Sequence, residues 1–235
     1  MIKRSPPARD DPEFSSLSDL AHAINTCRRC DLWKNATQGV PGEGTAHARI
    51  MLIGEQPGDQ EDLAGRPFVG PAGKLLDKAL AEAGVDRKEV YVTNAVKHFS
   101  WFPRGKRRMH KTPTQQEVAA CLDWLRQELR LVKPSIIVCL GATAAKALLG
   151  PSVRVTVDRG KWLESDLAEH VMVTVHPSSI LRVPREDFDD AYAALVRDFK
   201  LLAKSADYRY RHTAAPRSDH IQRFKLSMTA FVLRP

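Results

Sequence analysis

A carboxylate and an amide follow a short apolar segment in the first quarter of the chain. Residues 49–53 read Arg-Ile-Met-Leu-Ile, a run typical of a strand that is buried on both faces. Glu55 and Gln56 stand in the Gly-Glu-Gln-Pro-Gly loop that ends this run. Ligands of an open α/β sheet bind beyond the carboxyl ends of its strands. The loop therefore predicts a functional site, whereas an ordinary turn would need neither side chain.

A second apolar run ends in the same manner. Residues 171–175 read Val-Met-Val-Thr-Val and lead into His176, which Pro-Ser-Ser follows. Because glutamate is common on exposed loops, one such loop is weak evidence for a site. Two strands that both end in polar side chains strengthen the prediction of a site at this edge of the sheet.

A basic and aromatic segment occupies the middle of the chain. Residues 97–111 read KHFSWFPRGKRRMHK, with six Lys or Arg, three aromatic residues and no acid. Cations neutralise phosphates and aromatic rings stack on bases, so the segment favours nucleic-acid contact over a solvated loop with buried aromatics. The irregular aromatic spacing and the Pro-Arg-Gly at 103–105 predict a loop. His110 lies among four cations, whose repulsion should keep it neutral as a nucleophile or base; the alternative is a histidine that only contacts phosphate.

The four cysteines indicate a metal site more than a disulfide framework. Cys27 and Cys30 have the C-x-x-C spacing that lets two thiolates reach one metal, while Cys121 and Cys139 are expected on a helix and on a strand. For Cys139 a buried apolar role is an equal alternative. Four thiolates suit zinc or an iron–sulfur cluster, but a zinc ribbon would need a second C-x-x-C pair. A thioredoxin-type pair should begin a helix, whereas Cys27 ends a helical segment. Spacing alone favours metal without fixing which one.

Strands that alternate with helices predict an α/β fold with a parallel sheet and helices on both faces. Strands are expected at 49–53, 89–96, 135–140 and 171–175, and an edge strand or hairpin at 153–163. Helices are expected from Gly70 to Gly84, from Thr114 to 132, and at 141–149 and 187–202. Glu117 stands three residues after Thr114, as in a capping box.

Composition bounds the partner and the domain organisation. The 235 residues carry a formal net charge of +8, with a pI near 9.5, which favours a polyanionic partner such as nucleic acid. We expect a flexible segment at 1–15, one domain at 16–204, and a basic, flexible tail at 205–235 with six Lys or Arg against two Asp or Glu. The chain has no apolar run of membrane-spanning length and no signal-like start. A cytoplasmic monomer without a membrane partner is therefore expected.

Six sequence elements together resemble the uracil-DNA glycosylase superfamily, in particular its family 4 and the UdgX group. The resemblance covers Leu17 to Lys204 and is specific in the order and spacing of its elements. They are Cys27-x-x-Cys30, Gly54-Glu-Gln-Pro-Gly58, Gly65-Arg-Pro-Phe-Val-Gly70, Thr93-Asn94, Cys121 with Cys139, and His176-Pro-Ser178. The resemblance implies a three-layer α/β/α sandwich with a central four-stranded parallel sheet. It also implies a [4Fe–4S] cluster held by the four cysteines.

Two features resemble the UdgX group more than ordinary family 4 enzymes. Gln56 stands where family 4 typically has Ala or Gly, and the inserted Lys-Arg-Arg-x-His ends at His110 with Met109 in place of the usual Ile. In that group the inserted histidine bonds covalently to the deoxyribose after uracil leaves. The resemblance therefore implies uracil excision and a stable adduct between His110 and C1′. The alternatives are an ordinary hydrolytic family 4 enzyme and, less favoured, a non-catalytic iron–sulfur module that binds DNA or senses redox state.

The resemblance also assigns roles around a flipped uracil. Phe68 would stack on the base, Asn94 would read its O4 and N3 edge, and backbone amides from Gly54 to Asp59 would line the pocket. His176 would donate a hydrogen bond to uracil O2. Glu55 would stabilise the sugar cation and orient or deprotonate His110, and Gln56 would fix the loop that carries His110.

The remaining assignments concern DNA. Uracil-containing DNA is the expected partner, single-stranded in preference and possibly double-stranded, because unpairing is cheapest in a single strand. The residues expected to contact its backbone are Lys106, Arg107, Arg108, Ser178, Ser179 and Arg182.

Overall fold

A computed structural model describes residues 13–205 of the chain. The predicted N-terminal segment 1–15 and the predicted tail 205–235 lie almost entirely outside the described residues. Within 13–205, no helix combines the length and the apolar character that crossing a membrane requires.

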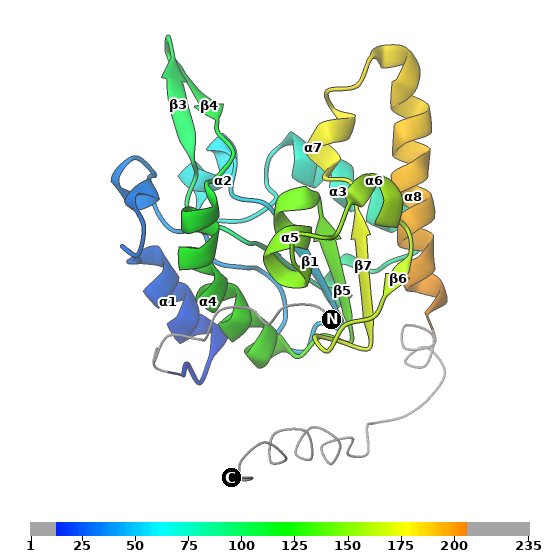
Figure 1. The fold of residues 1–235 in the computed structure, drawn as a ribbon, viewed down its shortest axis with the longest axis horizontal. Coiled ribbons are helices and arrows are strands. Elements are labelled where there is room, and N and C mark those ends of the chain that lie inside the picture. The colour runs from blue at the N-terminus through cyan, green and yellow to red at the C-terminus, as the bar shows by residue number, and fades with distance from the viewer. Residues whose placement is uncertain (1–12, 206–235) are drawn as a thin grey trace.

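A five-stranded sheet forms the centre of the molecule, in the order β2-β1-β5-β7-β6 (Figure 1). Its parallel members are β1 (Ile50–Gly54), β2 (Val90–Asn94), β5 (Ile136–Leu140) and β7 (His170–Thr174). The predicted four-stranded parallel sheet is therefore present. The fifth strand, β6 (Trp162–Leu163), adds a short antiparallel edge beside β7. Most of the predicted 153–163 edge segment is instead occupied by a short helix, α6 (Val155–Asp158), and the turn that follows it.

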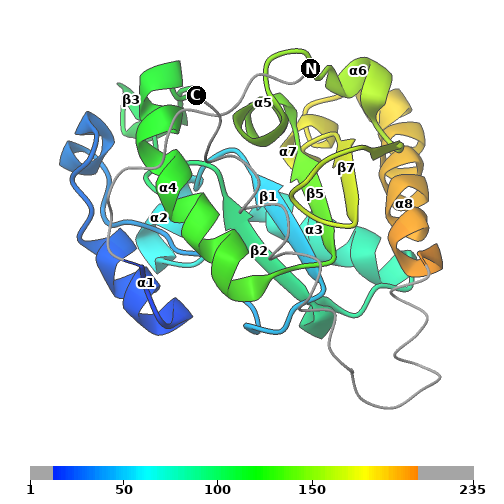
Figure 2. The same cartoon turned by 60° about the horizontal axis from the view of Figure 1, so that its bottom comes forward.

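Alternating side chains along the buried strands supply two separate hydrophobic cores. Ile50 and Leu52 pack in one core together with residues of α3 (Pro71–Glu82) and α8 (Phe188–Lys204). Met51 and Ile53 pack in the other core, against α4 (Gln115–Val132) and α5 (Ala142–Leu149). Successive residues of a strand point to opposite faces, so this pattern requires helices on both sides. Figure 2 shows the resulting three layers, which confirm the predicted α/β/α sandwich.

The helix ends largely follow the predicted signals. Thr114 accepts from the Glu117 backbone amide and the Glu117 carboxylate accepts from that of Thr114, which completes the capping box of α4. Helix α3 ends at Glu82 with Ala83 as its C-cap, and Gly84 follows with φ of 77°, the left-handed conformation that glycine adopts without strain. Three further short α-helices are α1 (Leu17–Asn25), α2 (Asp59–Ala64) and α7 (Pro177–Ile180), and single 3-10 turns lie at Asp31–Lys34, Arg87–Glu89 and Arg185–Asp187.

The basic segment forms a β-hairpin, contrary to the predicted loop. Strand β3 (Trp101–Arg104) pairs antiparallel with β4 (Arg107–His110), and Gly105 turns the chain with φ of 59°. The prediction relied on a buried strand face, which this hairpin does not have, since most of its side chains are exposed. In Figure 1 the hairpin projects beyond the body, at the end of the molecule where α7 also lies.

Candidate active site

The ends of β1 and β2 bring four of the predicted residues to one point. Gly54 and Asn94 are partners in the register of these two parallel strands. A Cβ atom added to Gly54 would overlap Asn94 Oδ1 and would lie 2.8 Å from Phe68 Cζ and 3.4 Å from His176 Nε2. Because Gly54 has no side chain, an aromatic ring, an amide and an imidazole can all approach its backbone closely.

Asn94 and Phe68 each adopt an energetically unfavourable state beside Gly54. Asn94 is buried, and among the described residues its Oδ1 has no hydrogen-bond partner, which is costly unless a ligand supplies a donor. Phe68 has φ of 57°, a left-handed conformation that non-glycine residues rarely adopt. Its carbonyl lies so close to α3 that a side chain at Gly73 would overlap it. Such strain and such an unpaired acceptor are typical of a binding site.

His176 has a defined tautomer at this site. The Ser178 backbone amide donates to His176 Nδ1 at 3.2 Å, so Nδ1 holds a lone pair and Nε2 carries the hydrogen. Burial lowers the pKa of His176 to about 4, and the charges of His110 and Arg182 act in the same direction. At neutral pH, His176 therefore presents a neutral Nε2–H donor beside Gly54, close to Asn94 and Phe68.

Ser178 and Ser179 both support His176 through their hydroxyl groups. The Ser178 hydroxyl lies 2.8 Å from His176 Nδ1, and the Ser179 hydroxyl donates to the His176 carbonyl at 2.7 Å. Arg182 is exposed and reaches the Ser178 hydroxyl at 3.4 Å. Ser178 and Ser179 are half-buried and Arg182 is exposed, and the contacts of all three with the DNA backbone stay predictions.

His110 lies at the last position of β4, close to Glu55. Its Nε2 is 3.4 Å from Glu55 Oε1, so the structure brings together the two side chains that were predicted to work on the sugar. Burial lowers the pKa of His110, Glu55 opposes this change, and Arg182 reinforces it. His110 is thus favoured in its neutral form, as predicted, but burial and Arg182 are the causes in place of the hairpin cations.

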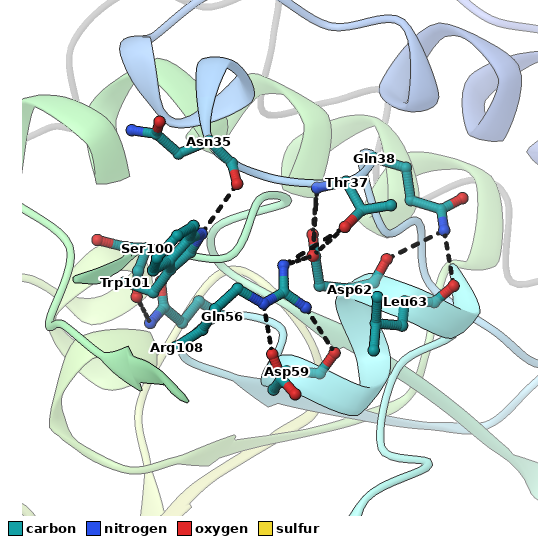
Figure 3. Close-up of polar contacts among 10 residues, drawn as sticks. All are labelled: Asn35, Thr37, Gln38, Gln56, Asp59, Asp62, Leu63, Ser100, Trp101 and Arg108. Carbon is teal, nitrogen blue, oxygen red and sulfur yellow. Dashed lines mark hydrogen bonds and ion pairs between the residues drawn. The ribbon is translucent and has the colours of Figure 1, made fainter. Parts of the chain in front are cut away.

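Gln56, in the loop after β1, forms hydrogen bonds with the residues that flank both strands of the hairpin. Its Nε2 donates to the carbonyls of Ser100 and Lys111 at 3.1 and 3.0 Å, and its Oε1 accepts from the Ser100 amide at 2.9 Å. The side chain thus spans the base of the hairpin, where it can fix the approach of His110 to Glu55. Figure 3 shows its contact with Ser100. This geometry agrees with the predicted role of Gln56.

Arg108 corrects a prediction, because its guanidinium is already bound to two carboxylates. Its Nε donates to Asp59 Oδ1 and its NH1 to Asp62 Oδ2, both at 2.6 Å, and only 20% of its side chain is exposed. Asp62 is fully buried and also accepts from Thr37. Figure 3 shows Arg108 between these acids of α2. Arg108 therefore fastens the hairpin to the body, whereas Lys106 and Arg107 remain exposed at its tip.

The comparisons with known proteins agree with this geometry. The family model of the uracil DNA glycosylase superfamily matches residues 41–200. This chain belongs to that superfamily. It is 37% identical to the type-4 uracil-DNA glycosylase of Archaeoglobus fulgidus over 188 residues, which cover 76% of this chain and 91% of the relative. It is 39% identical to the type-4 uracil-DNA glycosylase of Pyrobaculum aerophilum over 175 residues, covering 72% and 86%.

A solved structure supports the fold of this glycosylase superfamily member. The SMUG2 protein of Pedobacter heparinus superposes with a TM-score of 0.51 at 15% identity, over 68% of this chain and 77% of that one. At such low identity the likeness concerns the fold alone.

Three of the four cysteines gather beside the N-terminal helix, but Cys139 does not. Cys30 and Cys121 are in contact, and this hydrogen bond lowers the pKa of the Cys30 thiol to about 7. The Trp124 indole donates to the Cys27 sulfur at 3.2 Å. A charge on Cys27 also contributes to raising the pKa of the Cys121 thiol. Cys139 lies on β5 within the apolar core, where burial raises its pKa to about 12. The structure therefore does not bring Cys139 together with the other three cysteines, and its surroundings agree with the apolar alternative.

Sequence reasoning missed His98, which is adjacent in the chain to a residue that contacts Cys121. The Cys121 thiol contacts the backbone of Lys97, the residue before His98. His98 is only 2% exposed, and its Nδ1 has no hydrogen-bond partner within residues 13–205. In the same range, no three Cys, His, Asp or Glu side chains converge closely enough to hold a single metal ion. No spacing signal marks His98, because it follows a strand and pairs with no second motif.

Proposed function

We propose that this glycosylase superfamily member excises uracil from DNA and then binds the sugar covalently through His110. The observation that supports base recognition is the convergence of Phe68, Asn94 and His176 beside Gly54. A base rotated out of the DNA stack would lie against the ring of Phe68, which is nearly parallel to that of His176, with an interplanar angle of 28°.

Asn94 selects uracil by its unpaired acceptor. Uracil carries a hydrogen on N3, which would satisfy Asn94 Oδ1, and the Asn94 amide nitrogen would donate to O4. Cytosine has a lone pair at N3 and an amino group at C4, so it would place acceptor against acceptor and donor against donor. A buried group left without a partner costs about 1–3 kcal/mol, enough to discriminate strongly between the two bases.

His176 would promote cleavage of the bond between uracil N1 and the sugar C1′. The electron pair of this bond leaves with the base, and negative charge develops on O2 and N1. The Nε2–H of His176 is already aimed at the pocket and donates to O2, which stabilises charge as it forms. Because His176 stays neutral well below pH 7, it acts as a hydrogen-bond donor without giving up a full proton.

Glu55 and His110 would act on the sugar. The Glu55 carboxylate stabilises the positive charge that develops at C1′. With its own proton on Nδ1, His110 then attacks C1′ through the lone pair of Nε2, which lies 3.4 Å from Glu55 Oε1, and the resulting imidazolium releases the Nδ1 proton to solvent. The product ring is neutral, and uracil has left as an anion. Because no water has entered, the protein remains attached and turns over once.

The exposed cations around this site suit a DNA backbone. Lys106 and Arg107 at the hairpin tip and Arg182 after α7 are solvent-exposed and stand on either side of the pocket residues. Their contacts with phosphates carry no base specificity, so specificity would come from the pocket. Single-stranded DNA is the preferred substrate in this account, because extruding an unpaired base costs least.

Hydrolysis is the second candidate, and the relatives favour it. The relatives named above are type-4 uracil-DNA glycosylases, without mention of a covalent product. In that reaction Glu55 would activate water and His110 would contact phosphate.

A His110→Ser variant separates the two reactions, with His47→Ser as an exposed-histidine control. Each protein is incubated with a labelled single-stranded oligonucleotide containing uracil or thymine, then heated in SDS or treated with alkali. Capture predicts a uracil-dependent, heat-stable slow band that His110→Ser loses and His47→Ser retains. Alkali-labile breaks without such a band, in wild type, would establish hydrolysis. Neither product would favour the non-catalytic DNA-binding module.

An iron–sulfur cluster fits the gathered cysteines in a revised ligand set. Such a cluster binds each ligand at a different iron, so its ligands surround a space and need not converge on one point. Cys27, Cys30 and Cys121 would supply three thiolates, and the unpaired Nδ1 of His98 would supply the fourth ligand in place of Cys139. Glycosidic cleavage transfers no electron, so the cluster would order this part of the protein.

A further inference from the structure

Three of the four parallel strands deliver a residue to the proposed reaction, and β5 delivers none. Strand β2 ends at Asn94, β1 leads to Glu55, and β7 leads to His176. Strand β5 lies between β1 and β7 and leads into α5. The carboxyl end of β5 therefore faces the same site, and the first turn of α5 is the place to look for its contribution.

Thr143, the second residue of α5, makes a short hydrogen bond to Glu55. Its hydroxyl donates to Glu55 Oε2 at 2.5 Å, while the other oxygen, Oε1, faces His110 Nε2. One carboxylate oxygen is thus bound to the helix and the other is directed at the proposed nucleophile. The positive end of the α5 dipole also favours a carboxylate at this position.

The start of α5 is fitted closely to this arrangement. Gly141 precedes the helix with φ of 91°, a conformation that suits only glycine, and its amide donates to the Thr174 carbonyl at 2.8 Å. A Cβ at Gly141 would lie 3.2 Å from His176 Cβ. The backbone that carries Thr143 is therefore fixed against the end of β7, so the threonine hydroxyl is a stationary donor.

We propose that Thr143 is a positioning residue that holds Glu55 with Oε1 facing His110, and thereby sets the rate of the sugar step without contributing to uracil recognition. This proposal rests on the function proposed above. A glutamate without this hydrogen bond would sample several rotamers, and each rotation of Oε1 away from His110 would remove the negative charge that stabilises the sugar cation. A hydrogen bond to a charged acceptor is strong enough to select one rotamer.

Thr143→Val tests the proposal, because valine has nearly the same shape and lacks the hydroxyl. Under single-turnover conditions, we expect adduct formation on a uracil oligonucleotide to slow about tenfold, as for loss of a charge-assisted hydrogen bond. The Kd for the oligonucleotide should stay unchanged, because Asn94, Phe68 and His176 are untouched. Thr143→Ser restores the hydroxyl and should restore most of the rate. Thr156→Val makes the same change at an exposed position of α6 and should have no effect.

A double-mutant cycle with Glu55→Ala distinguishes positioning from a general effect on α5. If Thr143 acts through Glu55, adding Thr143→Val to Glu55→Ala causes no further loss of the residual rate. Additive losses would overturn the proposal, as would equal rates for wild type and folded Thr143→Val. If wild type yields abasic DNA and no adduct, covalent capture fails, but Thr143 is then judged by the rate of base release, which Thr143→Val should slow through Glu55 in the same way.

Discussion

The proposed base pocket beside Gly54 and the hairpin that carries His110 are held in place by different kinds of contact. The pocket lies at the ends of buried parallel strands, where main-chain pairing between β1 and β2 sets the position of Asn94. The hairpin is an exposed two-stranded element, and polar side chains fasten it to the body. Gln56 holds its base, Arg108 binds Asp59 and Asp62, and the Trp101 indole donates to the Asn35 carbonyl at 2.9 Å. The residues proposed to recognise the base therefore belong to the core, whereas sugar capture depends on an exposed hairpin that polar contacts hold against the body.

Substituting Gly54 should have the largest effect on base release, because a side chain there would displace residues that base recognition requires. A Gly54→Ala side chain would overlap Asn94 Oδ1 and lie 2.8 Å from Phe68 Cζ, so it would displace both side chains that are proposed to contact the base. We expect single-turnover base release to fall at least a hundredfold, and the adduct to be lost with it, since the cost of such an overlap is on the order of several kcal/mol. Retained base release in a variant with unchanged melting temperature would contradict the assigned pocket.

Releasing the hairpin should separate the two regions. Arg108→Gln leaves Asp62 buried beside a weaker partner and loosens the hairpin, so adduct formation should slow about tenfold or more while uracil-dependent base release persists. Arg107→Gln is the matched control, since it removes the neighbouring exposed charge and should affect only the salt dependence of DNA binding. Equal effects of both variants on capture would show that Arg108 acts through DNA after all.

The gathered cysteines lie where the chain passes from the pocket to the hairpin, since His98 stands between Asn94 and Trp101. We expect His98→Ala to lower the iron content of purified protein and to slow capture a few-fold, by relaxing this connection. Cys139→Ala should leave iron content and the visible absorbance of the protein unchanged, although it removes buried volume. The opposite pattern, with iron lost in Cys139→Ala alone, would restore the four-cysteine ligand set.

The two regions should also differ in their response to acid. Burial lowers the pKa of both histidines, but only His110 has Glu55 opposing the change. His110 should therefore protonate at a higher pH than His176, whose pKa is about 4. Protonation removes the attacking lone pair of His110, so as pH falls the adduct should decline first and base release later. Parallel loss of both products would argue against separate roles for the two imidazoles.

The strand-based part of the site could be predicted from sequence, because strand ends obey simple rules. Buried apolar runs locate β1 and β7, and the residues that follow them, Glu55 and His176, must meet at one edge. The capping box at Thr114 is equally local. These features depend on short-range patterns and on the known geometry of parallel sheets.

Three features of the site depend on tertiary contacts and could not be predicted. They are the contacts of the hairpin, the surroundings of Cys139 and the hydrogen-bond donor to Glu55. Arg108 reads as one more cation until its two acids on α2 are placed beside it. Cys139 reads as a ligand until β5 places it in the apolar core. Thr143 is an ordinary helix residue until α5 begins against the end of β7. None of these contacts leaves a periodic signal in the sequence.

The central claim is that the hairpin places His110 on the sugar of an excised uracil nucleotide, and peptide mapping of the product tests it most directly. Wild-type protein is reacted with a uracil oligonucleotide, digested with nuclease and protease, and sequenced by tandem mass spectrometry. The account predicts a peptide that carries a deoxyribose-derived mass on His110 and is absent after reaction with the thymine oligonucleotide. Unmodified His110 together with free abasic DNA would contradict it.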